Sequence, residues 1–219
     1  MIFVDEILYH KKQVQHVWEI GQSQAWTSAG TFNFTIPDDG YYDVIIIAGG
    51  AGGGGVAYLN ASGITKRASG GGGAMAGEAY SNQLLSKGDS ISVTVGAGGN
   101  VGENASSTSQ TATAGNGTDG EASRFGSLSI SNNGHGTGGV APRSGNETAG
   151  TGGTGSGSLG ANGTDGFTGS NATTKAGTGA SGYLYNGVRY GKGGDGSSSR
   201  TAGGNGGSGL VVVTLVAYA

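Results

Sequence analysis

The chain has 219 residues, of which 51 are glycine and only 2 are proline, and its formal net charge is -3. Collagen is excluded, because its triple helix needs proline as well as a glycine at every third position. Charged residues make up only 11% and cysteine is absent, so nothing points to nucleic acid, an anionic membrane, disulfides or a thiolate metal site.

The amino-terminal residues "MIFVDEILYHKK" do not resemble a signal peptide, because Asp5 and Glu6 stand where an apolar core is required. The longest apolar run, 210–219, is too short to cross a bilayer. We therefore expect synthesis in the cytoplasm and no membrane insertion.

Residues 1–26 are predicted to form a small amino-terminal β-hairpin, since Val14, His16, Trp18 and Ile20 recur at every second position. The remaining residues, 27–219, are predicted to form one glycine-rich domain.

Strand patterns surround the glycine-rich region on both sides. Phe32, Phe34 and Ile36 alternate with polar residues, which predicts a half-buried strand. Three further stretches are rich in β-branched residues and predict strands: 44–47, 91–95 and 210–218.

Between these strands, the spacing of glycine matters more than its amount: residues 49–209 hold 48 glycines. In a helix with three residues per turn, every third residue lies on the same side, and we call such a set a row. In 203–209 the glycines occupy two of the three rows, and Asn205 and Ser208 occupy the third. In 191–196 the third row holds Lys192 and Asp195, which should point outward and lie close enough to pair. This period predicts polyglycine II helices, whose backbones bond to one another rather than internally.

The alternative is low-complexity disorder, which has a similar glycine content. Each ordered glycine costs roughly 0.5–1 kcal/mol more than alanine, so only a bundle with many hydrogen bonds between helices would be stable. The regular rows and the flanking strands favour order. The predicted fold is therefore all-β with irregular parts: a polyglycine II sandwich beside a small β-strand part, with little or no α-helix.

Two nucleotide- or metal-binding motifs fail on their context. Gly50, Gly52 and Gly55 fit G-x-G-x-x-G, but neither a helix nor a suitably placed acid follows, as a dinucleotide site requires. The Asp-Gly sites at 119–120, 165–166 and 195–196 lack the aliphatic position of calcium nonapeptide repeats. No catalytic residue, cofactor site or metal site is predicted, and we expect no enzymatic activity.

The layout resembles the glycine-rich domain family of bacteriophage tail proteins, which includes receptor-binding adhesins at fibre tips. The resemblance rests on four landmarks in order: "WTSAGTFNFTIPDDGYYDVIIIAGGAGGGG", "LLSKGDSISVTVGAGG", "GNGTDGEASRFG" and "AGGNGGSGLVVVTLVAY". It implies a virion tail protein that contacts other tail proteins, with loops between glycine helices that contact a host surface glycan or protein. Residues 7–26 are also similar to the short β-repeats that open many phage tail proteins, which implies that the amino-terminal hairpin, 1–26, attaches the protein to the virion.

Three functions remain open: a tail-fibre or tail-tip adhesin, a purely structural virion spacer or decoration protein, and a glycine-rich ice-binding protein. The candidate receptor loops are 56–69, 100–114, 140–149 and 183–190. The candidate contact residues in them are Tyr58, Asn60, Arg67, Asn104, Arg143, Asn146, Tyr183, Tyr185, Arg189 and Tyr190. The tyrosines of 183–190 have a second interpretation, in which they cover the flank of the sandwich.

Nine glycine segments are evident: 49–55, 70–77, 96–99, 115–120, 134–139, 150–160, 176–182, 191–196 and 203–209. If neighbours run antiparallel, a return to the β part requires an even number, which a tenth segment near 166–170 would supply. The first three candidate loops lie at the free end with either number. Loop 183–190 lies at the free end with nine segments and at the β end with ten.

Overall fold

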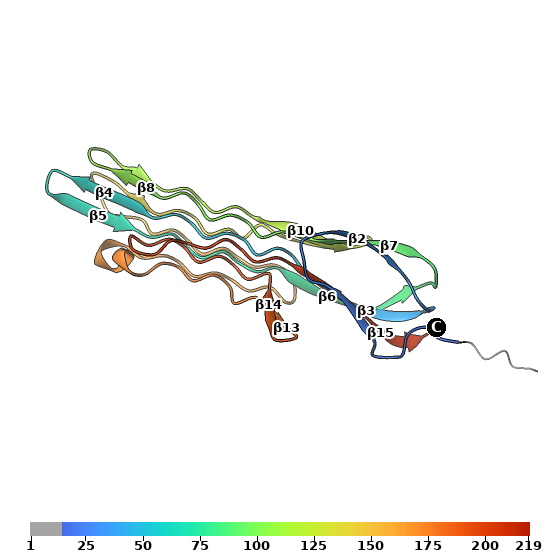
Figure 1. Ribbon diagram of the computed structural model, residues 1–219. Coiled ribbons are helices and arrows are strands. Elements are labelled where there is room, and N and C mark those ends of the chain that lie inside the picture. The colour runs from blue at the N-terminus through green and yellow to red at the C-terminus, as the bar shows by residue number, and fades with distance from the viewer. Residues whose placement is uncertain (1–14) are drawn as a thin grey trace, which may run out of the picture.

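The computed structural model describes residues 15–219 and is elongated, with two stacked β-sheets at one end and a bundle of extended segments running from them (Figure 1). Short strands join the segments at the opposite, distal end. The only helix of the described part is a 3₁₀ helix, η1 (Gly169–Thr173). None of the described residues forms a helix suited in length and apolarity to crossing a bilayer. The predicted all-β fold is confirmed.

Two four-stranded antiparallel sheets form the β end. The first sheet has the order β1 (Ser23–Trp26), β15 (Leu210–Tyr218), β3 (Gly40–Ile47) and β6 (Gly77–Leu85). The second has the order β11 (Leu128–Asn132), β10 (Gly120–Phe125), β7 (Ser90–Val95) and β2 (Gly30–Thr35). The predicted strands are therefore present. The strand just before the glycine-rich region, β3, pairs directly with the strand just after it, β15.

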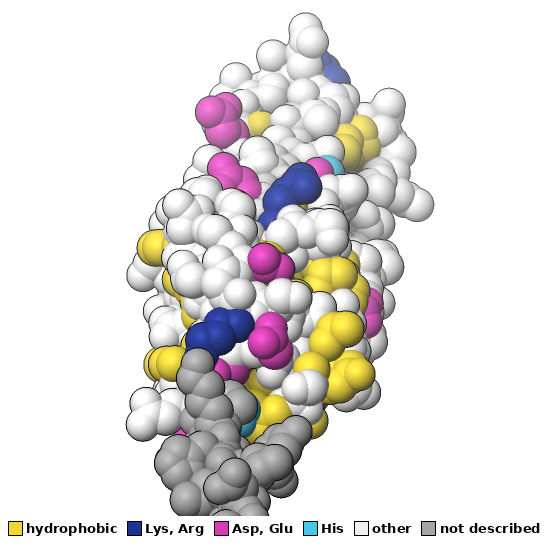
Figure 2. Space-filling model, turned by 90° about the vertical axis from the view of Figure 1, so that its right-hand side faces the viewer, with side chains coloured by type: hydrophobic (Ala, Val, Ile, Leu, Met, Phe, Trp, Pro, Cys, Tyr) yellow, Lys and Arg dark blue, Asp and Glu magenta, His cyan; other side chains and the backbone are white. Residues whose placement is uncertain are grey.

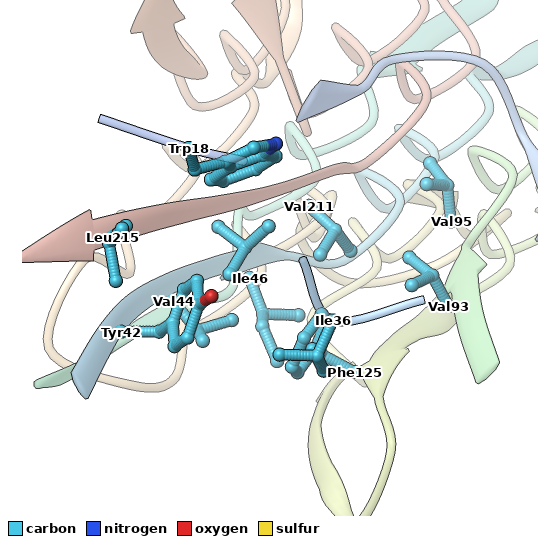
Figure 3. Close-up of a cluster of buried hydrophobic side chains, with 11 residues drawn as sticks. Trp18, Ile36, Tyr42, Val44, Ile46, Val93, Val95, Phe125, Val211 and Leu215 are labelled. Carbon is cyan, nitrogen blue, oxygen red and sulfur yellow. The ribbon is translucent and has the colours of Figure 1, made fainter. Parts of the chain in front are cut away.

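The main core lies between these sheets (Figure 3). Tyr42, Val44 and Ile46 point inward from β3, which shows the period of two expected of a strand. Val93 and Val95 of β7 face them from the second sheet. The β end is thus an ordinary apolar sandwich that anchors the glycine segments.

The amino-terminal segment joins this sandwich. Trp18 is buried in the core, and β1 pairs with β15 rather than with a neighbouring strand of its own segment. The predicted hairpin within 1–26 lies partly outside the described residues. In 15–26 the structure has a single strand, because the edge of β15 was available for pairing.

A buried carboxylate fixes the path of this segment. Asp38 is only 2% exposed, and its Oδ2 accepts the N–H groups of Val17 and Trp18 at 2.7 Å each. Its Oδ1 lies 3.2 Å from the Lys87 ammonium. Burial raises the pKa of Asp38, but the bonds from Trp18, Lys87 and Val17 outweigh it and hold that pKa below its ordinary value of 3.8.

Ten extended segments make up the bundle of the described chain, and successive segments alternate in direction. Those running away from the β end are 49–55, 96–103, 134–139, 161–166 and 191–197. Those returning are 70–76, 115–120, 150–156, 177–181 and 203–209. The even number agrees with the parity argument, but the tenth segment is 161–166, not 166–170. Segment 150–160 was wrongly taken as one piece, because a turn at Gly157, where φ is +80°, divides it from 161–166.

Hydrogen bonds between segments recur every third residue, as polyglycine II requires. Gly50 donates to the Gly207 carbonyl at 2.7 Å, and Gly53 donates to that of Gly204 at 3.3 Å. Successive residues of 49–55 thus point their N–H groups toward three different neighbours, and the pattern repeats at every third residue. The N–H and C=O groups of this segment together reach six neighbouring segments: 71–76, 99–102, 115–121, 136–139, 194–197 and 204–207.

Only one other described segment, 70–76, also has six neighbours, and these two segments are the centre of the bundle. Both are fully buried, and in both glycine or another small residue occupies nearly every row. Within 49–55 a Cβ on any of the six glycines would lie about 2 Å from a neighbouring carbonyl oxygen. None of these six glycines has a positive φ, so glycine is required here for close approach and not for a turn.

The outer segments have one row facing solvent, and polar side chains on that row satisfy the backbone of the next segment. Asn205 Oδ1 accepts the N–H of Val101 at 2.8 Å. In the same way Asp165 accepts from Gly152 and Asp195 from Gly179, both at 2.8 Å. Two of the three Asp-Gly sites therefore serve packing, and the described residues contain no cluster of three metal-ligating side chains.

The predicted outward pair is confirmed. Lys192 Nζ lies 3.9 Å from Asp195 Oδ2, and both side chains are about half exposed, at 52% and 53%. A solvated pair of this kind contributes at most ~1 kcal/mol. The pair does show which row of 191–197 faces solvent, namely the row that holds Lys192 and Asp195.

Gly206 and Gly207 form a matched pair for testing the packing. A Cβ on Gly206 would lie 1.7 Å from the Gly50 carbonyl oxygen, whereas one on Gly207 would meet its nearest atom at 3.4 Å. We expect Gly206→Ala to destabilise the protein by at least about 3 kcal/mol, lowering Tm on the order of 10 °C. Gly207→Ala should change Tm little. Equal shifts measured by circular dichroism for both variants would contradict the period-three packing.

Asp38→Ala should weaken attachment of the amino-terminal segment, because the buried Trp18 N–H and the partly buried Val17 N–H lose their acceptor. We expect a loss of about 1–3 kcal/mol near pH 7. Since the folded pKa of Asp38 is depressed, its contribution is complete only well above the ordinary value of 3.8 and is lost as pH falls through the folded pKa. The gap in unfolding free energy between wild type and variant should therefore narrow below pH 4. If this difference in unfolding free energy stays constant down to the lowest pH at which the protein remains folded, the negative charge of Asp38 does not contribute.

Candidate functional site

The alternation of segments gathers five connections at the distal end, about the length of the bundle away from the sandwich (Figure 1). These distal loops are 56–69, 104–114, 140–149, 167–176 and 198–202. The bundle holds the stems of all five loops in fixed register. Chain segments far apart in the sequence therefore contribute to one surface.

Three of the distal loops carry short strands. β4 (Ala57–Ala61) pairs with β5 (Ile64–Ala68) and, in parallel, with β8 (Ala105–Ser107). A smaller ladder joins β9 (Ala112–Thr113) to β12 (Val140–Ala141). Beneath them lies an apolar cluster of small side chains around Leu59, which is fully buried.

The burial pattern of β4 alternates, so its two faces have different roles. Ala57, Leu59 and Ala61 face the apolar cluster. Tyr58 and Asn60 lie on the opposite face, and Arg67 is the cross-strand partner of Tyr58. The guanidinium carbon of Arg67 lies 5.0 Å from the centroid of the Tyr58 ring. Three predicted contact residues therefore share one outward face.

A cavity of about 380 Å³ opens beside this face. Tyr58, Arg67 and Asn104 line it together with residues of two other distal loops. Asn104 Oδ1 accepts the Val56 N–H at 2.9 Å, which leaves the Asn104 amide N–H groups as donors. The lining contains two arginines and no carboxylate: Val56, Tyr58, Arg67, Asn104, Ala105, Ser106, Thr173, Ser199 and Arg200.

The remaining predicted distal residues lie in loop 140–149 and have different surroundings. Arg143 donates to the Ser109 carbonyl at 2.7 Å, and Lys66 donates to the Gly145 carbonyl. These bonds tie loop 140–149 to its two neighbours. Asn146 is exposed at the tip of the same loop. Arg143 is thus partly a structural tie, whereas Asn146 is accessible to a partner.

Residues 27–216 match the sequence profile of a family described as "Glycine-rich domain". The chain belongs to this glycine-rich domain family. A search of curated proteins gave no match. The family match begins just after β1 and ends within β15, so it covers both the sandwich and the bundle of the glycine-rich domain.

Loop 183–190 lies at the β end of the glycine-rich domain, as the parity of ten segments requires. It forms the hairpin β13 (Tyr183–Tyr185) and β14 (Val188–Tyr190), which projects from the side of the molecule in Figure 1. Tyr183, Tyr185 and Tyr190 pack against a second apolar cluster that includes Ile47 and Leu210. The tyrosines therefore cover the flank of the sandwich.

Arg189 belongs to the same hairpin and donates to the carbonyls of Ser181 and Gly182, at 3.4 and 3.1 Å. The four predicted contact residues of this hairpin are therefore at the β end, whereas Tyr58 and Arg67 are at the distal end of the bundle. The structure does not bring them together with the distal loops.

Sequence reasoning missed Thr173, Ser199 and Arg200, which line the cavity from loops 167–176 and 198–202. The first loop was taken as a place for the tenth glycine segment, and the second is too short to attract notice. The available signal was parity: once ten segments are assigned, every second connection must lie at the distal end. Loop 100–114 also begins later than expected, because segment 96–103 still bonds to the bundle at Gly102.

Two described histidines lie apart from this surface. His16 stacks on Tyr218 at the β end, with ring centroids 3.5 Å apart. His135 Nδ1 lies 2.6 Å from Asp119 Oδ1 on the side of the bundle. Neither contributes to the distal cavity.

Leu59 should control the order of the distal face. Leu59→Ala leaves a cavity in a cluster made otherwise of alanine, and typical losses for this substitution are about 2–5 kcal/mol. Because the distal sheet is separated from the sandwich by the bundle, we expect faster hydrogen exchange in β4 and β5 and little change in β3 and β15. Uniform acceleration throughout the protein would contradict this independence.

Proposed function

We propose that this glycine-rich domain is a non-enzymatic component of a bacteriophage tail fibre or tail tip that binds the host surface through its distal loops. The observation that supports this most is the convergence of five loops on one end of a stiff bundle. Their exposed residues are mostly Asn, Ser and Thr, together with Arg143 and Arg200, a composition suited to wet, adaptable recognition. Loops held by a rigid scaffold are a common location for binding sites.

The two ends would then divide the work. The described amino-terminal residues, 15–26, pack at the β end, so attachment to other virion tail proteins there would point the distal loops toward the host. The bundle keeps these ends apart, because its backbone bonds resist bending. This arrangement also favours the second candidate, a virion spacer or decoration protein without a receptor, which needs the bundle but not the loop residues.

Blocking each end separately distinguishes these functions. The chain has no cysteine, so a single introduced cysteine can be coupled specifically to polyethylene glycol maleimide. Asn60→Cys and Asn146→Cys place the polymer at exposed distal positions, and Ser127→Cys places it at an exposed turn of the β end. The measurement is the amount of fluorescently labelled protein that stays bound to the cells of each strain in a panel of bacteria.

We expect the unmodified protein to bind a subset of strains, distal polymer to reduce that binding at least about tenfold, and polymer at position 127 to leave it intact. Thermal unfolding of each conjugate serves as the folding control. Binding that survives polymer at both distal positions would count against the adhesin and favour the spacer.

A further inference from the structure

Positive charge is concentrated at the distal end. Only one acid, Glu147, lies in the distal loops, against five basic residues: Lys66, Arg67, Arg143, Lys175 and Arg200. The molecule as a whole has a net charge of -3, so the rest of the chain is acidic. Figure 2 views the opposite, β end, where acidic, basic and hydrophobic side chains are all visible among the described residues.

Three of these five cations already have a partner. Lys66 and Arg143 donate to carbonyls of neighbouring loops, and Lys175 lies 5.8 Å from the centroid of the Phe167 ring. Like Lys175, Arg67 and Arg200 have no carboxylate or carbonyl acceptor in the described chain, but they differ from Lys175 in position. Both line the distal cavity.

The Arg67 side chain and the backbone around Arg200 are held in place, although the donors of both guanidiniums are unused. Arg67 lies over the Tyr58 ring, an arrangement that leaves the N–H edge of the guanidinium available in its own plane. Arg200 lies in a turn closed by the bond from Ser198 N–H to the Thr201 carbonyl at 2.9 Å. The neighbouring Ser199 N–H bonds to the carbonyl of Ala172 in η1 at 3.1 Å. The Arg67 guanidinium and the loop backbone that carries Arg200 are therefore preorganised.

The cavity offers mainly hydrogen-bond donors and one aromatic ring. Its volume of about 380 Å³ lies within the range of small-ligand sites, roughly 300–1,000 Å³. Two guanidiniums and the Asn104 amide select for an anion, since such donors bind carboxylate and phosphate oxygens strongly. The adjacent hydroxyls of Ser106, Thr173 and Ser199 suit a polyhydroxylated ring. An extended protein surface would instead require a broad, flatter patch.

We propose that this cavity binds a sugar residue that carries an anionic substituent, a carboxylate or a phosphate. Arg67 and Arg200 bind the anion, Asn104 donates to an acceptor oxygen, and the hydroxyl-bearing residues bind the ring. This inference deepens the proposed host-surface function and rests on it. A host glycan with acidic sugars would supply such a group.

The test is titration of the ¹⁵N-labelled protein, followed by NMR of the Arg67 and Arg200 Nε–H and the Asn104 side-chain amide. The probes are glucuronate, glucose 6-phosphate, glucose and inorganic phosphate. The variants are Arg67→Gln and Arg200→Gln, with Arg124→Gln on exposed β10 as a control with the same charge change. We expect the two acidic sugars to shift all three side-chain signals and glucose to bind at least about tenfold more weakly.

Each cavity variant should weaken binding of the acidic sugars by about tenfold, or ~1.4 kcal/mol, and Arg124→Gln should not. Added salt should weaken binding as well. Binding by only one of the two acidic sugars would identify the substituent as phosphate or carboxylate and would support the proposal. Equal binding of glucose would overturn it, and so would inorganic phosphate binding as tightly as both acidic sugars.

The same variants separate this inference from the proposed function. If Arg67→Gln and Arg200→Gln retain full cell binding while distal polymer abolishes it, the acidic-sugar site is wrong and the adhesin proposal stands. If cell binding is absent but the acidic sugars bind selectively in the cavity, the inference stands and host adhesion does not.

Discussion

Backbone-to-backbone hydrogen bonding at close approach is the interaction on which this structure depends. An extended glycine segment has no internal bonds, so each N–H and C=O must find a partner on another segment. These bonds are 2.7–3.3 Å long between 49–55 and its neighbours, which brings the backbones so near that a Cβ would strike a carbonyl oxygen. Side-chain burial, the usual source of stability, contributes little inside the bundle. The apolar sandwich at the β end compensates by fixing where the first and last segments begin and end.

This constraint also organises the surface. An inner segment needs small residues on all three rows, whereas an outer segment needs them only where it faces a neighbour. The third row of an outer segment then has a defined task, since its Asn, Asp and Thr side-chain oxygens accept hydrogen bonds from backbone N–H groups of the next segment that have no backbone acceptor. Asn205, Asp165 and Asp195 illustrate this task, as does Thr137, whose Oγ1 accepts the Thr151 N–H at 2.7 Å. These four polar side chains of the bundle therefore serve its packing.

The distal loops escape this constraint because β4, β5 and β8 satisfy their backbones in a conventional sheet. With the backbone paired and Leu59 buried beneath, the outward positions become open to polar and charged side chains. Tyr58, Arg67 and Asn104 meet there with Arg200, which is 133 positions from Arg67 in sequence numbering and yet lines the same cavity. A rigid bundle that returns five times to one end is what makes such a meeting possible.

The sequence by itself determined the local conformations. Period-three glycine rows, the alternation in 32–36 and 91–95, and the apolar run at 210–218 each specify a backbone shape through short-range sterics and burial. It also indicated Tyr58, Asn60 and Arg67 as outward residues, and the need for an even number of segments. Tertiary structure alone decided that 161–166 is a separate segment, that 49–55 and 70–76 are central, and that the 183–190 tyrosines cover the sandwich. It also paired β1 with β15 and brought Arg200 to the cavity. These outcomes depend on which segment lies beside which. Backbone hydrogen bonds between glycine segments are nearly identical whichever two segments pair, so the sequence of one segment does not identify its neighbour.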